Sequence, residues 1–140
     1  MQYKIILILC STSLLLLLAA CGGGDTSDGG QAEAVSGDPG RGETLFNQSS
    51  IGSASASGCM TCHSLEEGVT LVGPSLAGVA ARAPERVPEL SAEEYLRQSI
   101  VEPNAYVVEG FSEGLMYQNY GRELTDQQIA DLVAFLLTLE

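Results

Sequence analysis

The sequence predicts a small all-α domain with about three to five short helices over residues 38–140. Three segments begin with helix-capping residues and continue with apolar residues at helical spacing. No run of alternating apolar and polar residues is long enough to indicate a strand, and no internal repeat is visible. The pattern is therefore typical of short helices joined by long loops.

The first helix is predicted to begin after Asp38. This residue offers a side-chain acceptor at the N-cap, and Pro39 suits the first helical position, where no backbone donor is needed. Leu45 and Phe46 give the helix an apolar face. The Ser/Gly/Ala-rich segment 47–58 that follows predicts a surface loop.

Two capping boxes predict the two longer helices. Ser91 is followed three residues later by Glu94, and Thr125 is followed in the same way by Gln128. Pro103 ends the first of these helices. The apolar residues at helical spacing are Tyr95, Leu96 and Ile100 in one helix, and Ile129, Leu132, Val133 and Leu136 in the other.

Short helices and long loops leave a small core for a domain of this length. Below about 120 residues, one small core gives only marginal stability unless something else fills the centre. A large apolar cofactor would fill it, so the sequence favours a domain folded around a bound group.

The pattern Cys59-x-x-Cys62-His63 is the most specific motif in the chain. In an exported protein this pattern indicates covalent attachment of c-type haem. The two thiols become thioethers to the porphyrin, and the adjacent imidazole binds the iron. The motif therefore predicts one haem c, with Cys59 and Cys62 as attachment residues and His63 as an axial ligand.

Three other interpretations of the motif explain the sequence less well. A structural zinc site needs four ligands, yet His63 is the only histidine and Cys21 is the only other cysteine beyond the first 20 residues. A thioredoxin-like pair is expected in a βαβ setting, which the pattern lacks. A plain disulfide between Cys59 and Cys62 explains neither the adjacent histidine nor the small core.

The segments around the motif resemble the class I cytochromes c, which are small single-haem electron carriers, over residues 38–140. In that family, a glycine and an aromatic residue of the first helix cross the last helix. Gly42 and Phe46 match these positions, against Leu132 and Phe135. The resemblance implies the small cytochrome c fold around one covalent haem.

The family's G-P-x-L segment matches the four residues 73–76, which include Pro74. The resemblance implies that the Pro74 carbonyl accepts a hydrogen bond from His63 and so fixes the ring's tautomer and orientation. It also implies a methionine before the last helix as the sixth iron ligand, and Met116 stands there. The family often has a proline directly after this methionine, whereas here Tyr117 follows.

Elimination also favours Met116 as the sixth ligand. Beyond the first 20 residues the chain has two methionines, no lysine and no second histidine. Met60 lies between the attachment cysteines and cannot reach the face opposite His63. The alternative is that Met116 is a core residue and that the iron is five-coordinate or water-bound.

Several residues near the predicted site have two interpretations. Arg82 stands where many relatives place a basic residue near a haem propionate, but it could equally be a solvated arginine. Tyr106, Tyr117 and Tyr120 could donate hydrogen bonds to propionates, although core packing explains them as well. The segment 47–58 is longer than the family usually places before its motif.

The first 20 residues predict a cleaved leader. Lys4 precedes an apolar stretch of about 14 residues, which is shorter than the roughly 20 that a spanning helix needs. The ending Leu-Ala-Ala-Cys resembles a bacterial lipobox and predicts lipidation at Cys21, although an ordinary secretory leader is the alternative. The Gly/Ser/Asp-rich segment 21–37 predicts a flexible tether. We therefore expect an exported domain, anchored to the outer face of the cell membrane or facing the periplasm.

The charge of the chain beyond the leader is strongly acidic. Five arginines stand against all 18 acidic residues, a net charge of −13. Such a field repels nucleic acid and favours redox protein partners with basic docking surfaces. We expect a single-electron carrier of a respiratory or photosynthetic chain that performs no bond chemistry and takes no small-molecule substrate. The alternatives are a subunit through which electrons enter a larger redox complex, and a haem gas sensor or enzyme with a labile sixth ligand.

Overall fold

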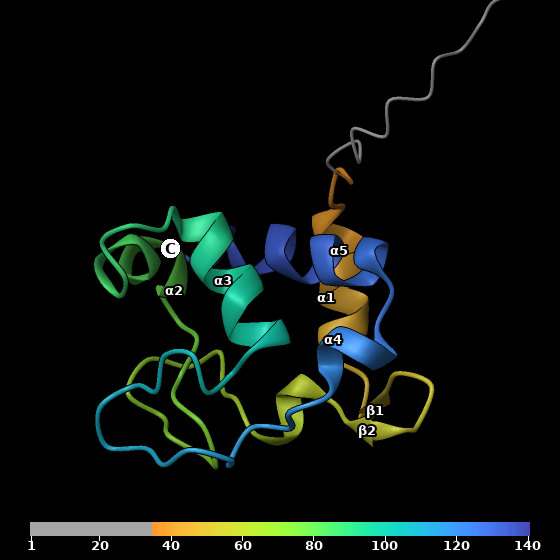
Figure 1. The fold of residues 1–140 in the computed structure, drawn as a ribbon, viewed down its shortest axis with the longest axis horizontal. Coiled ribbons are helices and arrows are strands. Elements are labelled where there is room, and N and C mark those ends of the chain that lie inside the picture. Colours follow the sequence, from red (N-terminus) through yellow and green to blue (C-terminus); the bar gives the residue numbers. More distant parts are fainter. Residues whose placement is uncertain (1–34) are drawn as a thin grey trace, which may run out of the picture. The chain divides into compact units, whose positions relative to one another are not determined.

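The computed structural model describes residues 35–140, which form a helical domain with one small sheet (Figure 1). Its α-helices are α1 (Pro39–Phe46), α2 (Val79–Arg82), α3 (Ala92–Val101), α4 (Tyr120–Glu123) and α5 (Asp126–Leu136). The expected all-α fold is confirmed. The predicted leader 1–20, Cys21 and all but the end of the predicted tether 21–37 lie outside the described residues. None of the described helices is long and apolar enough to cross a membrane.

The helix starts predicted from the sequence are formed. The Asp38 carboxylate accepts a hydrogen bond from the backbone of Arg41 at 2.8 Å, which caps α1. Both capping boxes are complete. In each, the side chain of the N-cap residue accepts a hydrogen bond from the backbone N–H three residues on, and the side chain of that later residue accepts one from the backbone N–H of the N-cap residue. Helix α3 ends at Val101, two residues before Pro103.

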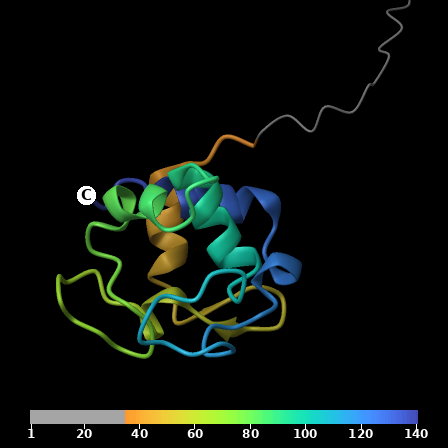
Figure 2. The same cartoon turned by 60° about the vertical axis from the view of Figure 1, so that its left-hand side comes forward.

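Helices α1 and α5 pack closely against each other (Figures 1 and 2). A Cβ atom on Gly42 would lie 1.9 Å from the carbonyl oxygen of Asp131, so only glycine allows this approach. One turn on, the rings of Phe46 and Phe135 meet with their centroids 5.4 Å apart, within the range of favourable aromatic pairs. The crossing expected from the family resemblance is confirmed at Gly42 and Phe46.

A buried carboxylate strengthens the same crossing. Asp131, only 3% exposed, accepts hydrogen bonds from the backbone of Asp38 at 2.7 Å and from Gln127 at 2.8 Å. It also accepts two from the guanidinium of Arg41, at 2.8 and 2.9 Å. The hydrogen bonds from Arg41 lower the pKa of Asp131 to about 2, so this carboxylate is ionised at neutral pH.

The segment 47–58 is not the plain surface loop that its composition predicts. Strands β1 (Ser50–Ile51) and β2 (Ala56–Ser57) pair within it as an antiparallel hairpin. Ile51 and Ala56, which face each other in the register, are 3% and 8% exposed and belong to the core. Strands of two residues are too short to show alternation, which explains why no strand is predicted there.

Long loops surround one side of the helices (Figures 1 and 2). One runs from the 3₁₀ turn at Cys59–Thr61 to α2, and the other joins α3 to α4. Helices α2 and α4 are single turns without side-chain caps, so no capping pattern in the sequence predicts them. These two loops carry the residues of the predicted iron site.

Candidate haem-binding site

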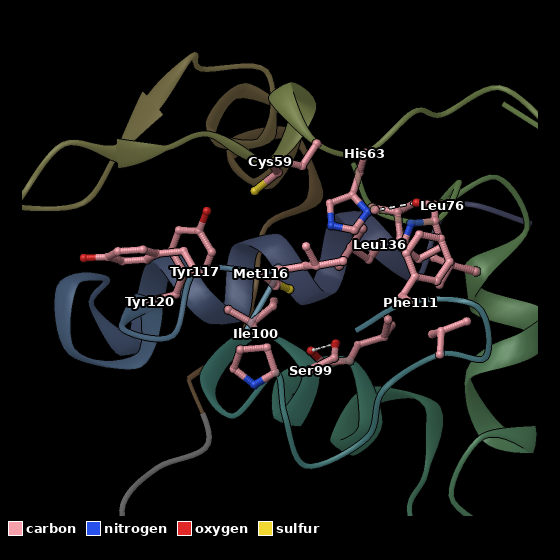
Figure 3. Close-up of a pocket in the computed structure, with 18 of the residues that line it drawn as sticks. Cys59, His63, Leu76, Ser99, Ile100, Phe111, Met116, Tyr117, Tyr120 and Leu136 are labelled. Atoms are coloured by element: carbon pink, nitrogen blue, oxygen red, sulfur yellow. Dashed lines mark hydrogen bonds between the residues drawn. The ribbon is translucent and has the colours of Figure 1, made fainter. Parts of the chain in front are cut away.

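A cavity of about 430 Å³ lies between the two long loops and the helices. This volume falls within the usual range of ligand pockets, about 300–1,000 Å³. Figure 3 shows Cys59, His63 and Met116 at this cavity, together with apolar side chains from α3, α5 and both loops. The apolar residues labelled there are Leu76, Ile100, Phe111 and Leu136.

The two cysteines of the motif are held in one tight turn. The backbone N–H groups of Cys62 and His63 both donate to the carbonyl of Cys59, at 3.1 and 2.9 Å. Gly58, directly before this turn, allows the backbone of Gln48 to lie close to it, because a Cβ there would lie 1.7 Å from the carbonyl oxygen of Gln48. Both cysteines are free thiols at the cavity wall. Burial raises the pKa of the Cys59 thiol to about 11.

His63 is oriented by the loop that follows it. Its Nδ1 lies 2.8 Å from the carbonyl oxygen of Pro74. Because a carbonyl can only accept, Nδ1 carries the proton and Nε2 keeps a free lone pair. The backbone of Gly73 lies close to the ring, since a Cβ there would lie 2.5 Å from the ring's Cε1 atom. Burial lowers the pKa of His63, partly opposed by the bond to Pro74, which favours the neutral imidazole that metals bind.

Arg82 supports the same loop through two hydrogen bonds. Its guanidinium donates to the carbonyls of Ala77 and Ser75, at 2.5 and 3.2 Å. The side chain is half-buried and lines the cavity. The structure therefore shows Arg82 holding this loop, which neither of the two interpretations from the sequence predicted.

Met116 reaches the cavity from the loop between α3 and α4 (Figure 3). It is half-buried, and its carbonyl accepts a hydrogen bond from the Gln118 side chain at 2.6 Å. Met60, by contrast, is 46% exposed and does not line the cavity. The structure thus brings His63 and Met116 to one cavity and leaves Met60 outside it.

The tyrosines near Met116 make hydrogen bonds within the protein. The Tyr117 hydroxyl donates to Glu123, and the Tyr120 hydroxyl donates to the Ser57 carbonyl at 2.5 Å. Their rings meet edge to face, with centroids 5.1 Å apart. Burial raises the pKa of Tyr120 to about 12. No sequence pattern points to Glu123, which lies far from the hairpin in the chain and belongs to no motif.

The donors at the cavity fit a c-type haem. Two free thiols in one turn suit two thioether bonds, and a neutral imidazole with a free Nε2 suits an axial position. The close approach of Gly73 to the imidazole limits the room in which the ring can turn. Among residues 35–140, no cluster of three or more His, Cys, Asp or Glu side chains could hold a bare metal ion. The surrounding wall is apolar, as a porphyrin requires.

The sequence matches a model of a known protein family. The family model described as Cytochrome c matches residues 40–140, which include the cysteine motif, Pro74 and Met116. No curated protein matches the sequence.

Proposed function

Because the chain belongs to the cytochrome c family and is a haem-based electron carrier, we propose that one haem c attached to Cys59 and Cys62 carries its electron, with His63 and Met116 as axial ligands. The residues that line one cavity are the main support for this proposal. It holds both thiols, an imidazole fixed by Pro74 and one methionine. The expected small cytochrome c fold supports the same assignment.

The residues around the cavity prepare it for electron transfer. Haem iron with both axial positions filled exchanges single electrons with little ligand movement, and a methionine ligand raises its reduction potential. Pro74 holds the His63 ring in one tautomer, so the imidazole need not reorient. Leu76 and Phe111 line the cavity, and apolar side chains there would limit the access of water to the haem, which further sets the potential.

The cellular setting is part of the proposal. Lipidation at Cys21 and the tether up to residue 37 would attach the domain to a membrane outside the cytoplasm and let it swing between partners. The charge of −13 beyond the leader favours redox partners with basic docking surfaces and electron-transfer rates that fall with salt. A respiratory or photosynthetic chain supplies such partners.

A second candidate is a subunit through which electrons enter a larger redox complex. Exposed apolar residues favour this second candidate, because a cluster of them on the surface typically marks a site of contact with another protein. Four of them lie in the single loop 64–72, where Glu66 and Glu67 separate Leu65 from the other three. Beyond Val35, the exposed large apolar residues of the described part are Met60, Leu65, Val69, Leu71, Val72 and Leu115, of which Val72 and Leu115 line the cavity.

The visible spectrum of the purified protein, oxidised and reduced and then treated with carbon monoxide, tests the ligation. A low-spin spectrum that carbon monoxide leaves unchanged is expected for filled axial positions. Rapid carbon monoxide binding would instead indicate a sensor or an enzyme with a labile sixth ligand. Absence of haem after expression with intact c-type maturation would contradict the proposed cofactor.

A further inference from the structure

One carboxylate joins the loop that carries Met116 to the β1–β2 hairpin. Glu123, the last residue of α4, accepts a hydrogen bond from the Tyr117 hydroxyl with Oε1. With Oε2 it accepts a hydrogen bond from the backbone N–H of Ala54 at 3.3 Å. Tyr117 directly follows Met116, and Ala54 lies in the turn between the two strands. Two segments distant in sequence therefore meet at one side chain.

The hairpin is a firm anchor for this carboxylate. Ile51 and Ala56 are buried in the core, and the Tyr120 hydroxyl donates to the carbonyl of Ser57. Gly52 lies against Glu123, because a Cβ there would come within 2.9 Å of Oε2. The edge-to-face contact between Tyr117 and Tyr120 also orients the Tyr117 ring (Figure 3).

The other side-chain hydrogen bonds of the loop around Met116 stay within that loop: Gly114 donates to Asn104 at 2.9 Å, and Gln118 donates to the Met116 carbonyl at 2.6 Å. From residue 103 to residue 119 the loop contains no helix or strand. Its backbone hydrogen bonds are local, such as those from Phe111 to Val108 and from Leu115 to Ser112. Hydrogen bonds to an ionised carboxylate are about twice as strong as neutral ones. The bond from Tyr117 to Glu123 is therefore the hydrogen bond beside the methionine that ties the loop to another element.

We propose that Glu123, acting through Tyr117, is the positioning residue that keeps the Met116 sulfur on the iron. The inference rests on the proposed His63/Met116 ligation and names the residues that maintain it. The longer segment 47–58 then has a role: it supplies the fixed surface on which Glu123 is held. The side-chain bond stiffens a position where Tyr117, unlike a proline, leaves the backbone free.

Imidazole binding to the full-length ferric holoprotein measures this positioning, because imidazole can enter only when the sulfur leaves. Tyr117→Phe and Glu123→Ala are each expected to raise the affinity for imidazole about 10- to 100-fold, the loss of a hydrogen bond to a charged group. The double variant should gain no more than either single variant, since both remove one bond. Glu123→Gln, whose amide oxygen can still accept from Tyr117, should restore part of the wild-type behaviour.

Glu113→Ala is the matched control. It removes the same charge from an exposed residue in the same loop and should bind imidazole as the wild type does. Affinities of Tyr117→Phe and Glu123→Ala equal to this control would overturn the proposal, as would additive effects in the double variant. So would a lower resistance to denaturant with unchanged imidazole affinity, since that indicates a purely structural bond. If Glu123→Ala does not fold, Tyr117→Phe carries the test alone.

The wild-type spectrum separates this inference from the proposed function. A wild-type protein without low-spin His/Met character contradicts the ligation itself. A wild-type protein with that character, together with variants that match the control, contradicts only the role of Glu123.

Discussion

The two sides of the cavity hold their proposed iron ligands in different ways. On the histidine side, the ligand and its supports lie close together in sequence, between Cys59 and Arg82, and the contacts are mostly backbone contacts. On the methionine side, the supports come from a hairpin and from α4, and the contacts run through side chains.

This difference indicates which ligand is preorganised by the chain alone. Pro74 and Gly73 hold the imidazole through backbone atoms, which cannot change rotamer. The position of Met116 depends on the rotamers of Tyr117 and Glu123. We therefore expect the histidine to stay bound under conditions in which the methionine exchanges, and four variants test that expectation.

Gly73→Ala should have the largest effect, because it disrupts the preorganised side. The added Cβ would lie 2.5 Å from Cε1 of His63 and must displace either the ring or the loop. Overpacking of this kind typically costs about 1–3 kcal/mol and sometimes more. We expect little holoprotein, measured as the haem absorbance per protein after expression with c-type maturation.

Gly40→Ala in α1 is the control, since a Cβ there meets only the Asp38 side chain at 3.3 Å. Normal haem content in Gly73→Ala would mean that the ring is not confined, and the contrast between the two sides would fail.

Met116→Leu should open the iron with little cost to the fold. Leucine matches methionine in size, so the free energy of unfolding is expected to fall by less than about 1.5 kcal/mol. Carbon monoxide should then bind completely to the reduced protein, because no sulfur remains to compete. Met60→Leu, at an exposed position outside the cavity, is the matched control and should not bind it. A Met116→Leu protein that excludes carbon monoxide would show that another group is the sixth ligand.

The sequence predicted the histidine side better than the methionine side for a physical reason. The cysteine motif, Gly73, Pro74 and the capping boxes act through neighbouring residues, so their spacing in the chain predicts their geometry. The crossing of α1 and α5 was also predictable, because Gly42 and Phe46 match a known family pattern.

The contacts of Glu123 could not be predicted in this way. Glu123 and Ala54 are 69 positions apart, and neither belongs to a motif. The hairpin has strands of two residues, below the length at which alternation appears. Arg82 was expected either near a propionate or in solvent, whereas its bonds to the carbonyls of Ser75 and Ala77 depend on the path of a loop without regular structure.

Asp131→Asn should weaken the crossing that supports both sides equally. The amide cannot accept all the hydrogen bonds that the carboxylate accepts, and we expect a loss of about 2 kcal/mol in unfolding free energy. Because folding lowers the pKa of Asp131 from 3.8 to about 2, the carboxylate's contribution is complete above about pH 4 and disappears as pH falls toward about 2. Denaturant unfolding at several pH values measures it.

Asp126→Asn is the control for Asp131→Asn. Its partner Arg97 is exposed and its own side chain is 76% exposed, so the loss should stay below about 1 kcal/mol. A difference between wild type and Asp131→Asn that stays constant down to pH 2 would contradict the assigned ionisation. Imidazole affinity should not change, since the crossing favours neither ligand.

Arg82→Met should have the smallest effect and sharpens the comparison most. The variant keeps an unbranched side chain over the cavity wall but loses the donors to Ser75 and Ala77, at a cost of about 1–2 kcal/mol. Backbone bonds from Gly73 to Cys62 and from Leu76 to Ser64, each 2.8 Å, remain to hold Pro74 against His63. Imidazole affinity should therefore equal that of the wild type.

An increase as large as that expected for Tyr117→Phe would mean that the histidine side also depends on side-chain contacts. A shifted reduction potential with unchanged affinity would instead support the predicted contact between Arg82 and a propionate, because removal of a nearby positive charge favours the oxidised iron.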